Sequence, residues 1–193
     1  DYVSIPHSSA VDIRRTISVS MWMKVDSFAN EWMPAFYKGS GGSNGRTYAL
    51  WQENSRYLHN TSVDSSGQEH ANTGSIISTG NWYHVVSLFD RSGGTSKIYV
   101  NNALSASGSV RQTDTVSNTK ALLFGWTHES SSNYSTFDGQ FDEVRLYDRI
   151  LNTDEITYLY TSTTTDTDSD GLSDAEEAGL GTNPPLADTD GDG

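Results

Sequence analysis

The chain contains no cysteine, so no disulfide framework can hold its fold together and stability has to come from a buried core. Its 193 residues are enough for one well-buried domain with a small appendage. No apolar run approaches the length of a membrane-spanning helix. We therefore expect a single core domain without a membrane span.

Basic residues are scarce and unevenly distributed. The formal net charge is −13, and residues 166–193 account for −9 of it, because they hold nine acidic residues and no Lys or Arg. Residues 1–165 hold sixteen acidic and twelve basic residues and are only mildly acidic. Neither part offers the basic stripe that nucleic acid requires. The composition argues against nucleic-acid binding and makes the tail a candidate for binding cations.

Most of the chain has the composition of β-strands. The candidate segments are rich in β-branched and aromatic residues, and clusters of Gly, Ser, Asn and Asp separate them. They are 16–25, 47–52, 82–89, 96–101, 121–126 and 140–147. Short strands with turns between them and no helical period are typical of antiparallel sandwiches and jelly rolls. The sequence therefore predicts an all-β fold of two antiparallel sheets.

One short helix is predicted near the end of this part, at 153–160. Asn152 can cap its first turn, and Glu155 stands three residues later, where its side chain can reach back to the cap. Ile156 and Leu159 give the helix an apolar face.

The composition changes after this helix. Residues 161–165 (TSTTT) are predicted to form a linker, and the hexapeptide DTDSDG at 166–171 recurs as DTDGDG at 188–193, a period of 22 residues. We therefore divide the chain into a β-sandwich over 1–160, the linker, and a repeat tail over 166–193, cut short within its second repeat.

The first repeat has the ligand order of an EF-hand calcium loop. Oxygen donors occupy the required positions, and Gly171 stands at the sixth, where the loop must turn sharply. The predicted Ca²⁺ ligands are Asp166, Asp168, Asp170, the Leu172 carbonyl, Asp174 and Glu177. Carboxylates this close repel one another unless a cation lies between them. The alternative is a disordered acidic linker.

A second loop begins in the next repeat, with Asp188, Asp190 and Asp192, and its closing residues are absent. We expect that site to be weak or empty. The polar, β-branched residues before the first loop make a poor entering helix. Calcium is therefore expected to stiffen the tail into a spacer between modules, and a calcium switch is the less favoured reading.

Several runs together resemble the laminin G-like (concanavalin A-like) jelly-roll domain, over roughly residues 1–160. They include YVSIPHSSAVDI, ISVSMWMKVDSF, GNWYHVVSLFD and FDGQFDEVRLYDRILNTDEITYLY. The tail resembles the thrombospondin type 3 repeats of bacterial proteins. The resemblance implies a two-sheet sandwich in an extracellular, secreted or cell-surface protein, often next to a polysaccharide-degrading enzyme or in an adhesin. It also implies neighbouring modules in the same polypeptide.

The resemblance further suggests a structural calcium ion near the first and last strands. If Val144 and Leu146 face inward in the segment QFDEVRLY, Asp142 shares their face, and a buried carboxylate needs hydrogen bonds or a cation. Calcium could then bring Asp1 and Asp142 together. The equally weighted alternative is that backbone amides or a neighbouring side chain satisfy Asp142.

The sequence does not favour catalysis. Retaining glycoside hydrolysis needs two carboxylates about 5 Å apart, and no strand carries acidic residues at alternate positions. Asp142 and Glu143 are adjacent and would point to opposite faces. The histidines show no metal-binding spacing. They are His7, His59, His70, His84 and His128. We expect a module that is not an enzyme.

Strand parity predicts an aromatic surface. If Leu50 faces the core, its neighbour Trp51 faces outward, and if Leu58 faces the core, Tyr57 and His59 face outward. These three side chains could form an exposed platform. Flat aromatic rings flanked by polar groups suit pyranose rings. The alternative, weighted equally, is that the patch packs against a loop or another domain.

Polar residues border this platform, and Arg46 is expected at its edge. The loop 126–139 provides a second candidate rim, chiefly through Trp126 and Tyr134. The low positive charge argues against heavily sulfated ligands. The leading hypothesis is a non-catalytic carbohydrate-binding module that takes a polysaccharide or oligosaccharide. Its rival is a protein-binding or adhesion module of a surface protein, and a less favoured third is a subdomain that completes a neighbouring active site.

Overall fold

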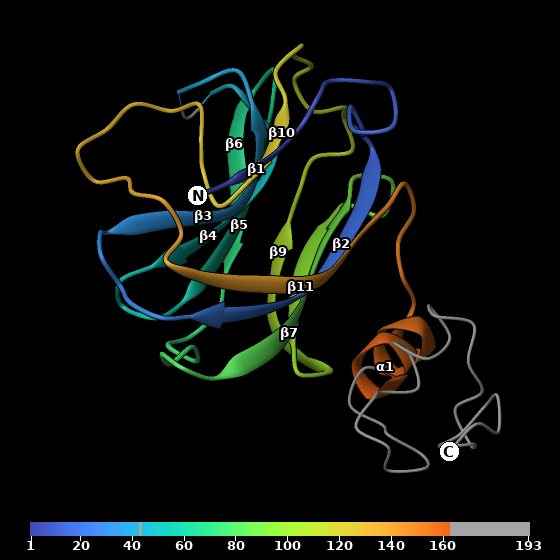
Figure 1. Cartoon of the computed structure of the whole chain (residues 1–193). Coiled ribbons are helices and arrows are strands. Elements are labelled where there is room, and N and C mark those ends of the chain that lie inside the picture. The colour runs from blue at the N-terminus through green and yellow to red at the C-terminus, as the bar shows by residue number, and fades with distance from the viewer. Residues whose placement is uncertain (43, 163–193) are drawn as a thin grey trace, which may run out of the picture. The chain divides into compact units, whose positions relative to one another are not determined.

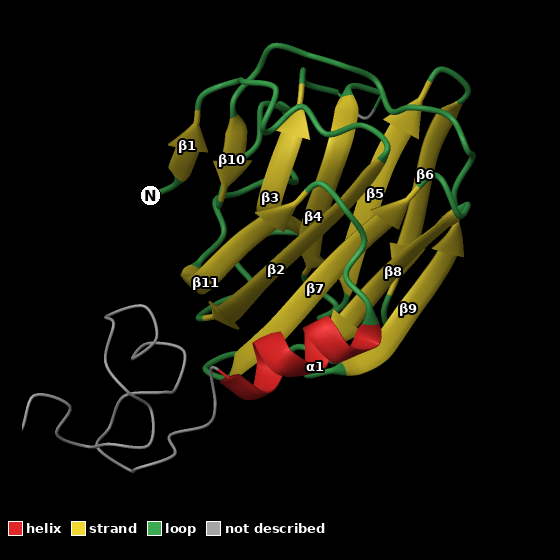
Figure 2. Cartoon of the chain, turned by 90° about the vertical axis from the view of Figure 1, so that its right-hand side faces the viewer, coloured by secondary structure: helices red, strands yellow, loops and turns green. Residues whose placement is uncertain are grey.

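A computed structural model describes residues 1–42 and 44–162. The chain divides into two compact units, 1–151 and 152–193. Within the described residues, the first unit consists of eleven strands in two antiparallel sheets that face each other, as Figure 1 and Figure 2 show. The predicted all-β jelly-roll sandwich is confirmed.

The larger sheet has six strands in the order β1-β10-β3-β4-β5-β6. Their bounds are Val3–Ile5 (β1), Leu122–Phe124 (β10), Trp32–Gly39 (β3), Arg46–Glu53 (β4), Leu58–Asp64 (β5) and Gly67–Asn72 (β6). The register of this sheet sets Trp51 opposite His59, and His59 opposite Asn72. Side chains of three neighbouring strands therefore meet on one face.

The smaller sheet has five strands in the order β11-β2-β7-β8-β9. Their bounds are Gly139–Tyr147 (β11), Thr16–Val25 (β2), Trp82–Asp90 (β7), Thr95–Val100 (β8) and Ala103–Ser109 (β9). In Figure 2 this sheet forms the layer nearer the viewer.

The core lies between the two sheets. One side chain in two along each central strand points into it, as a pleated strand requires. Met21 and Phe89 from the smaller sheet meet Phe36, Leu50 and Leu58 from the larger one, and all five are almost completely buried. Burial of this apolar surface is the main source of stability in a chain without disulfides.

The six segments predicted from composition are all present as strands, and the structure adds five others, β1, β3, β5, β6 and β9, of which β5 holds the Leu58–His59 stretch that the parity argument already used. Strand β6 reads GQEHAN, and only Ala71 in it is buried. Strand β3 contains Pro34, next to a register shift. Such strands form because their neighbours supply hydrogen-bonding edges, and their own apolar pattern is weak.

The helix α1 spans Thr153–Ser162. The amides of Asp154 and Glu155 donate to the Asn152 side chain (2.9 Å each), and Glu155 accepts from the Asn152 amide (2.8 Å). The predicted capping box is confirmed. The helix continues two residues into the range predicted as a linker. No helix in the described residues is long and apolar enough to cross a membrane.

The calcium ligands predicted in the tail lie outside the described residues. They are Asp166, Asp168, Asp170, Leu172, Asp174, Glu177, Asp188, Asp190 and Asp192. Binding of Ca²⁺ by the tail stays a prediction.

The burial argument for Asp142 is wrong. A β-bulge between Asp142 and Arg145 shifts the parity of β11, with Glu143 at a φ of 50°. As a result Val144 is 41% exposed and Asp142 is exposed too, with its carboxylate accepting from the Glu143 amide (2.8 Å). In residues 1–42 and 44–162, no group of three or more His, Asp or Glu side chains could hold a metal ion. Calcium between Asp1 and Asp142 stays a prediction without its original support.

Candidate functional site

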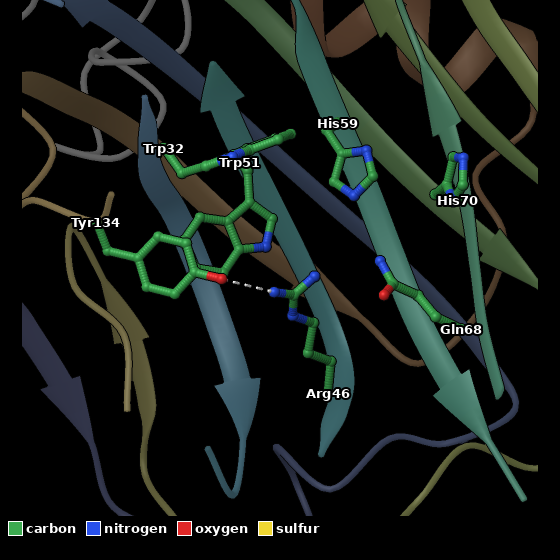
Figure 3. A pocket seen from close by; sticks show the side chains of 7 residues that line it. All are labelled: Trp32, Arg46, Trp51, His59, Gln68, His70 and Tyr134. Carbon is green, nitrogen blue, oxygen red and sulfur yellow. Dashed lines mark hydrogen bonds between the residues drawn. The ribbon is translucent and has the colours of Figure 1, made fainter. Parts of the chain in front are cut away.

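A pocket of about 340 Å³ opens on the face of the larger sheet that points away from the core. Strands β3 to β6 and the loop between β10 and β11 supply its lining, which Figure 3 shows. The lining residues are Trp32, Arg46, Trp51, His59, Gln68, His70 and Tyr134. Its volume lies within the range of small-molecule sites.

Strand parity explains why the pocket is on this face. In β4, Tyr48 and Leu50 belong to the core. Trp51 follows Leu50 directly, so the alternation of the strand points its side chain to the opposite face. In β5, Leu58 belongs to the core and His59 points to the pocket. The predicted facing of these residues is confirmed.

Arg46 reaches the same face because of a β-bulge. One step along β3, from Lys38 to Gly39, corresponds to two steps along β4, from Tyr48 to Arg46. Simple alternation would place Arg46 on the core side with Tyr48. The bulge instead brings its guanidinium to 4.9 Å from the centroid of the Trp51 ring. Arg46 thus lies in the pocket, at 6% exposure, and not at the edge of a platform.

The expectation that Trp51 is an exposed platform is wrong, because its side chain is only 1% exposed. Trp51 forms a small cluster with Tyr37 and Ala49, and Trp32 and Tyr134 pack over it. The Tyr134 ring lies 5.0 Å from the Trp51 ring and the Trp32 ring 6.4 Å away, at 87°. Parity fixes the face of a side chain but does not reveal what covers that face. Trp51 is the floor of the pocket.

Sequence reasoning missed three lining residues, Trp32, Gln68 and His70, and Trp32 is the aromatic one among them. It forms edge contacts with His59 (5.3 Å between centroids) and with Tyr57 (5.9 Å). It is half-buried, so part of its ring forms a wall of the pocket. A signal was present: Met33 is a core residue, so parity places Trp32 on the outer face. Pro34, two residues later, argued against a strand in this segment, because proline cannot donate a backbone hydrogen bond.

The structure brings four of the predicted binding residues together in this pocket: Arg46, Trp51, His59 and Tyr134. Tyr57 contacts the Trp32 ring and does not line the pocket. Trp126, predicted on a second candidate rim, is half-buried on the loop after β10 and does not line the pocket.

The loop that carries Tyr134 is tied to β3 through its backbone. The amide of Trp32 donates to the Asn133 carbonyl (3.0 Å), and the Trp32 carbonyl accepts from the Ser135 amide (3.2 Å). Trp32 and Tyr134 form an isolated bridge between these segments. The two aromatic walls of the pocket are therefore held at a fixed distance from each other.

A buried ion pair fastens the same loop to β4. Arg46 Nε donates to Glu129 Oε1 (2.5 Å) and a terminal nitrogen of Arg46 donates to Glu129 Oε2 (2.8 Å). The Tyr134 hydroxyl donates to the same Oε2 (3.2 Å). Burial opposes the charge on Arg46, but the hydrogen bonds and negative charge of Glu129 outweigh it and raise the pKa of Arg46. Arg46 therefore stays protonated.

His59 is uncharged at neutral pH. Burial lowers its pKa to about 4, a hydrogen bond with Asn72 opposes the shift, and the nearby His70 and Arg46 add to it. Its Nδ1 lies 2.5 Å from Oδ1 of Asn72. Because a carboxamide oxygen only accepts, Nδ1 carries the proton, and Nε2 keeps its lone pair.

Two donors in the pocket have no partner within the described residues. The indole Nε1 of Trp51 is buried and makes no hydrogen bond there. Arg46 uses Nε and one terminal nitrogen for Glu129 and Tyr134, so its other terminal nitrogen has no such bond. In Figure 3 both free donors point toward the space beside His59. A buried donor without a partner is costly, and a bound ligand would satisfy it.

The site thus combines aromatic walls with two free donors and, at His59, an acceptor. Its open side is formed by Gln68 and His70, which are exposed. Of the described residues that line it, none is acidic. This combination suits a compact molecule with apolar faces and several hydroxyl groups.

Comparison with known proteins places the chain in a family. Residues 1–157 match the sequence model of a laminin G-type family, which is described as the concanavalin A-like lectin/glucanases superfamily. The chain belongs to this superfamily. No curated protein sequence gives a significant match.

Solved structures of this superfamily's architecture resemble the chain in fold. The CBM40 domain of a Ruminococcus gnavus IT-sialidase, bound to α2,3-sialyllactose, has a TM-score of 0.65 at 16% identity, over 81% of this chain and 92% of that one. The binding domain of botulinum neurotoxin serotype G scores 0.64 at 14% identity, over 86% of this chain and 41% of that one.

A Trypanosoma rangeli sialidase scores 0.59 at 18% identity, over 78% of this chain. The chain spans only 23% of that sialidase and less than half of the neurotoxin domain. At these identities the likeness shows the shared jelly-roll fold.

Proposed function

We propose that the sandwich is a non-catalytic carbohydrate-binding module that holds a sugar ring in the pocket of the larger sheet. The observation that carries this proposal is the pairing of half-buried aromatic walls, Trp32 and Tyr134, with unpartnered donors at the floor, Trp51 and Arg46. A pyranose ring presents C–H faces to aromatic rings and hydroxyl groups to hydrogen-bonding groups at its rim. The pocket offers partners for both.

The same geometry argues against hydrolysis. Glycosidases of the retaining class need two carboxylates about 5 Å apart on either side of one sugar, and inverting ones also need two. Glu129 lies beside the pocket, and both of its oxygens already accept hydrogen bonds from Arg46. A carboxylate held in this way is poorly suited to act as nucleophile or general acid.

The fold neighbours support a binding role. The Ruminococcus gnavus domain is bound to a sialylated oligosaccharide, and the botulinum domain is a binding domain. A shared fold does not transfer a ligand, so the proposal for this chain depends on its own pocket. We further propose that the module works outside the cell, beside a polysaccharide-degrading domain, with the acidic tail as a calcium-stiffened spacer.

A protein-binding or adhesion role is the second candidate. The edge strand β1 exposes Val3 and Ile5 at 59% and 38%, and Tyr2 just before it is 58% exposed. An edge strand with apolar side chains can add a strand from a protein partner. This surface is separate from the pocket, so the two roles can be tested independently.

A glycan array, run with and without calcium, tests the carbohydrate role. We expect binding to at least one glycan by the wild type, with an affinity in the range of about micromolar to millimolar. Trp32→Ala removes a wall of the pocket and should abolish this binding. Trp82→Ala is the matched control, because Trp82 is 39% exposed on the other sheet. A silent array, or equal loss in both variants, would contradict the proposal.

A further inference from the structure

The polar groups at the floor of the pocket differ in kind, and this difference bears on which sugar can bind. Trp51 Nε1 and the free terminal nitrogen of Arg46 can only donate hydrogen bonds. His59 Nε2 can only accept, because Nδ1 bonds Asn72 through its proton. The site therefore requires a ligand group that accepts from two residues and donates to a third.

These groups are close enough to share one ligand group. Trp51 and His59 stand directly opposite each other in the antiparallel pair of β4 and β5, and such pairs have Cβ atoms about 4.5–5.5 Å apart. Arg46 lies over the Trp51 ring at 4.9 Å. Figure 3 shows all three side chains around the same space. Hydroxyl groups, alone or as adjacent pairs on a sugar ring, both accept and donate, whereas a carboxylate only accepts.

The charge balance of the pocket leads to the same conclusion. Arg46 is the cation at the floor, and Glu129 binds it at two points with only 3% of the Glu129 side chain exposed. The positive charge of Arg46 is therefore largely neutralised by Glu129, and the pair presents little net charge to the pocket. An anionic ligand beside Arg46 would approach the buried carboxylate of Glu129 and the lone pair of His59, and both interactions are repulsive.

We infer that the pocket selects an uncharged sugar ring over an acidic one. The ring is held through hydroxyl groups that accept from Arg46 and Trp51 and donate to His59. This inference rests on the proposed carbohydrate-binding function and narrows it. It separates this chain from the Ruminococcus gnavus domain, whose ligand α2,3-sialyllactose carries a carboxylate.

Matched pairs of sugars test the inference on the whole chain. The probes are glucose with glucuronic acid, galactose with galacturonic acid, and lactose with α2,3-sialyllactose, titrated at pH 7 by calorimetry. We expect the neutral member of at least one pair to bind about tenfold or more tightly than its acidic partner. Equal or tighter binding of the acidic members would overturn the inference and leave the carbohydrate role intact.

The glycan array separates the two possible failures. If none of the three pairs binds, the glycans that the chain binds on the array test the inference. Binding of neutral glycans supports it, and binding of acidic glycans alone overturns it. If the array is also silent, both the inference and the proposed function fail.

A variant tests the charge argument directly. Glu129→Gln removes the negative charge that neutralises Arg46, so the ratio of neutral to acidic affinity should fall by about tenfold or more. Asp114→Asn is the control, because Asp114 pairs with Arg14 and Arg15 at the surface, away from the lining residues. An unchanged ratio in Glu129→Gln would contradict the argument. The wild-type comparison stands by itself if this variant does not fold.

Discussion

Arg46 and Glu129 form a two-point ion pair in which the side chains are only 7% and 3% exposed. One residue lies on β4 and the other on the loop between β10 and β11, so the pair joins distant segments of the chain. Tyr134, on the same loop, also bonds Glu129 and covers Trp51. The pocket therefore depends on this pair as much as on the sheet beneath it.

The first prediction concerns the ion pair. Glu129→Ala leaves the Arg46 charge buried without its partner and should lower the free energy of unfolding by about 3–5 kcal/mol. Urea denaturation at pH 7 measures the change. Asp114→Ala breaks exposed pairs with Arg14 and Arg15 and should cost less than about 1 kcal/mol. Similar effects of the two substitutions would show that Glu129 does not anchor the loop.

A second prediction separates stability from binding at the two tryptophans. Trp51→Ala removes a side chain that is 1% exposed and should lower the free energy of unfolding by about 3–5 kcal/mol. Trp32→Ala removes a half-buried ring and should cost less, while still abolishing sugar binding. Thermal unfolding followed by calorimetry compares them. If Trp51→Ala changed stability by under 1 kcal/mol, Trp51 would be the exposed platform that the sequence suggested.

The sequence predicted the outer face of the larger sheet, but not its pocket. Alternation along β4 and β5 correctly placed Trp51 and His59 away from the core. The residues that cover Trp51 come from elsewhere: Trp32 begins a strand that Pro34 interrupts, and Tyr134 stands on a loop some eighty residues later in the chain. Contacts between distant segments leave no periodic pattern in a single sequence.

Bulges account for the remaining differences. A bulge is one extra residue that reverses the alternation beyond it, and two of them changed the positions of predicted site residues. One brings Arg46 into the pocket, and the other exposes Val144 and Asp142 on β11. Their positions depend on the partner strand, so a count along one strand cannot locate them.

A third prediction concerns the tail, whose ligands were identified from the sequence alone. Chelation of Ca²⁺ should make residues 166–193 sensitive to protease, because the carboxylates then repel one another. The sandwich should stay folded, since its buried core is formed by residues of the two sheets and the tail holds few apolar residues. Asp170→Ala should reproduce the effect of chelator while calcium is present. Limited proteolysis with mass spectrometry gives the readout. A single transition in which chelator unfolds the entire chain would contradict this division.

The last prediction follows from two buried histidines. Burial lowers the pKa of His59 and of His84 to about 4, with Arg46 and His70 adding to the shift at His59 and Arg145 at His84. In the unfolded chain both histidines titrate near 6.5. The unfolded state therefore binds more protons than the folded state between pH 6.5 and pH 4, and acid favours unfolding in that window.

The free energy of unfolding should accordingly be greatest above pH 6.5 and fall as the pH drops toward 4. Each histidine contributes up to about 1.4 kcal/mol per pH unit, or about 3 kcal/mol over the window. Urea denaturation at pH 7, 6, 5 and 4.5 measures the slope. His59→Gln should remove about half of it, because Gln does not titrate, whereas Gln68→Ala at the pocket rim should leave it unchanged. A flat profile between pH 7 and pH 4.5 would mean that burial does not lower the pKa of these histidines in the folded chain.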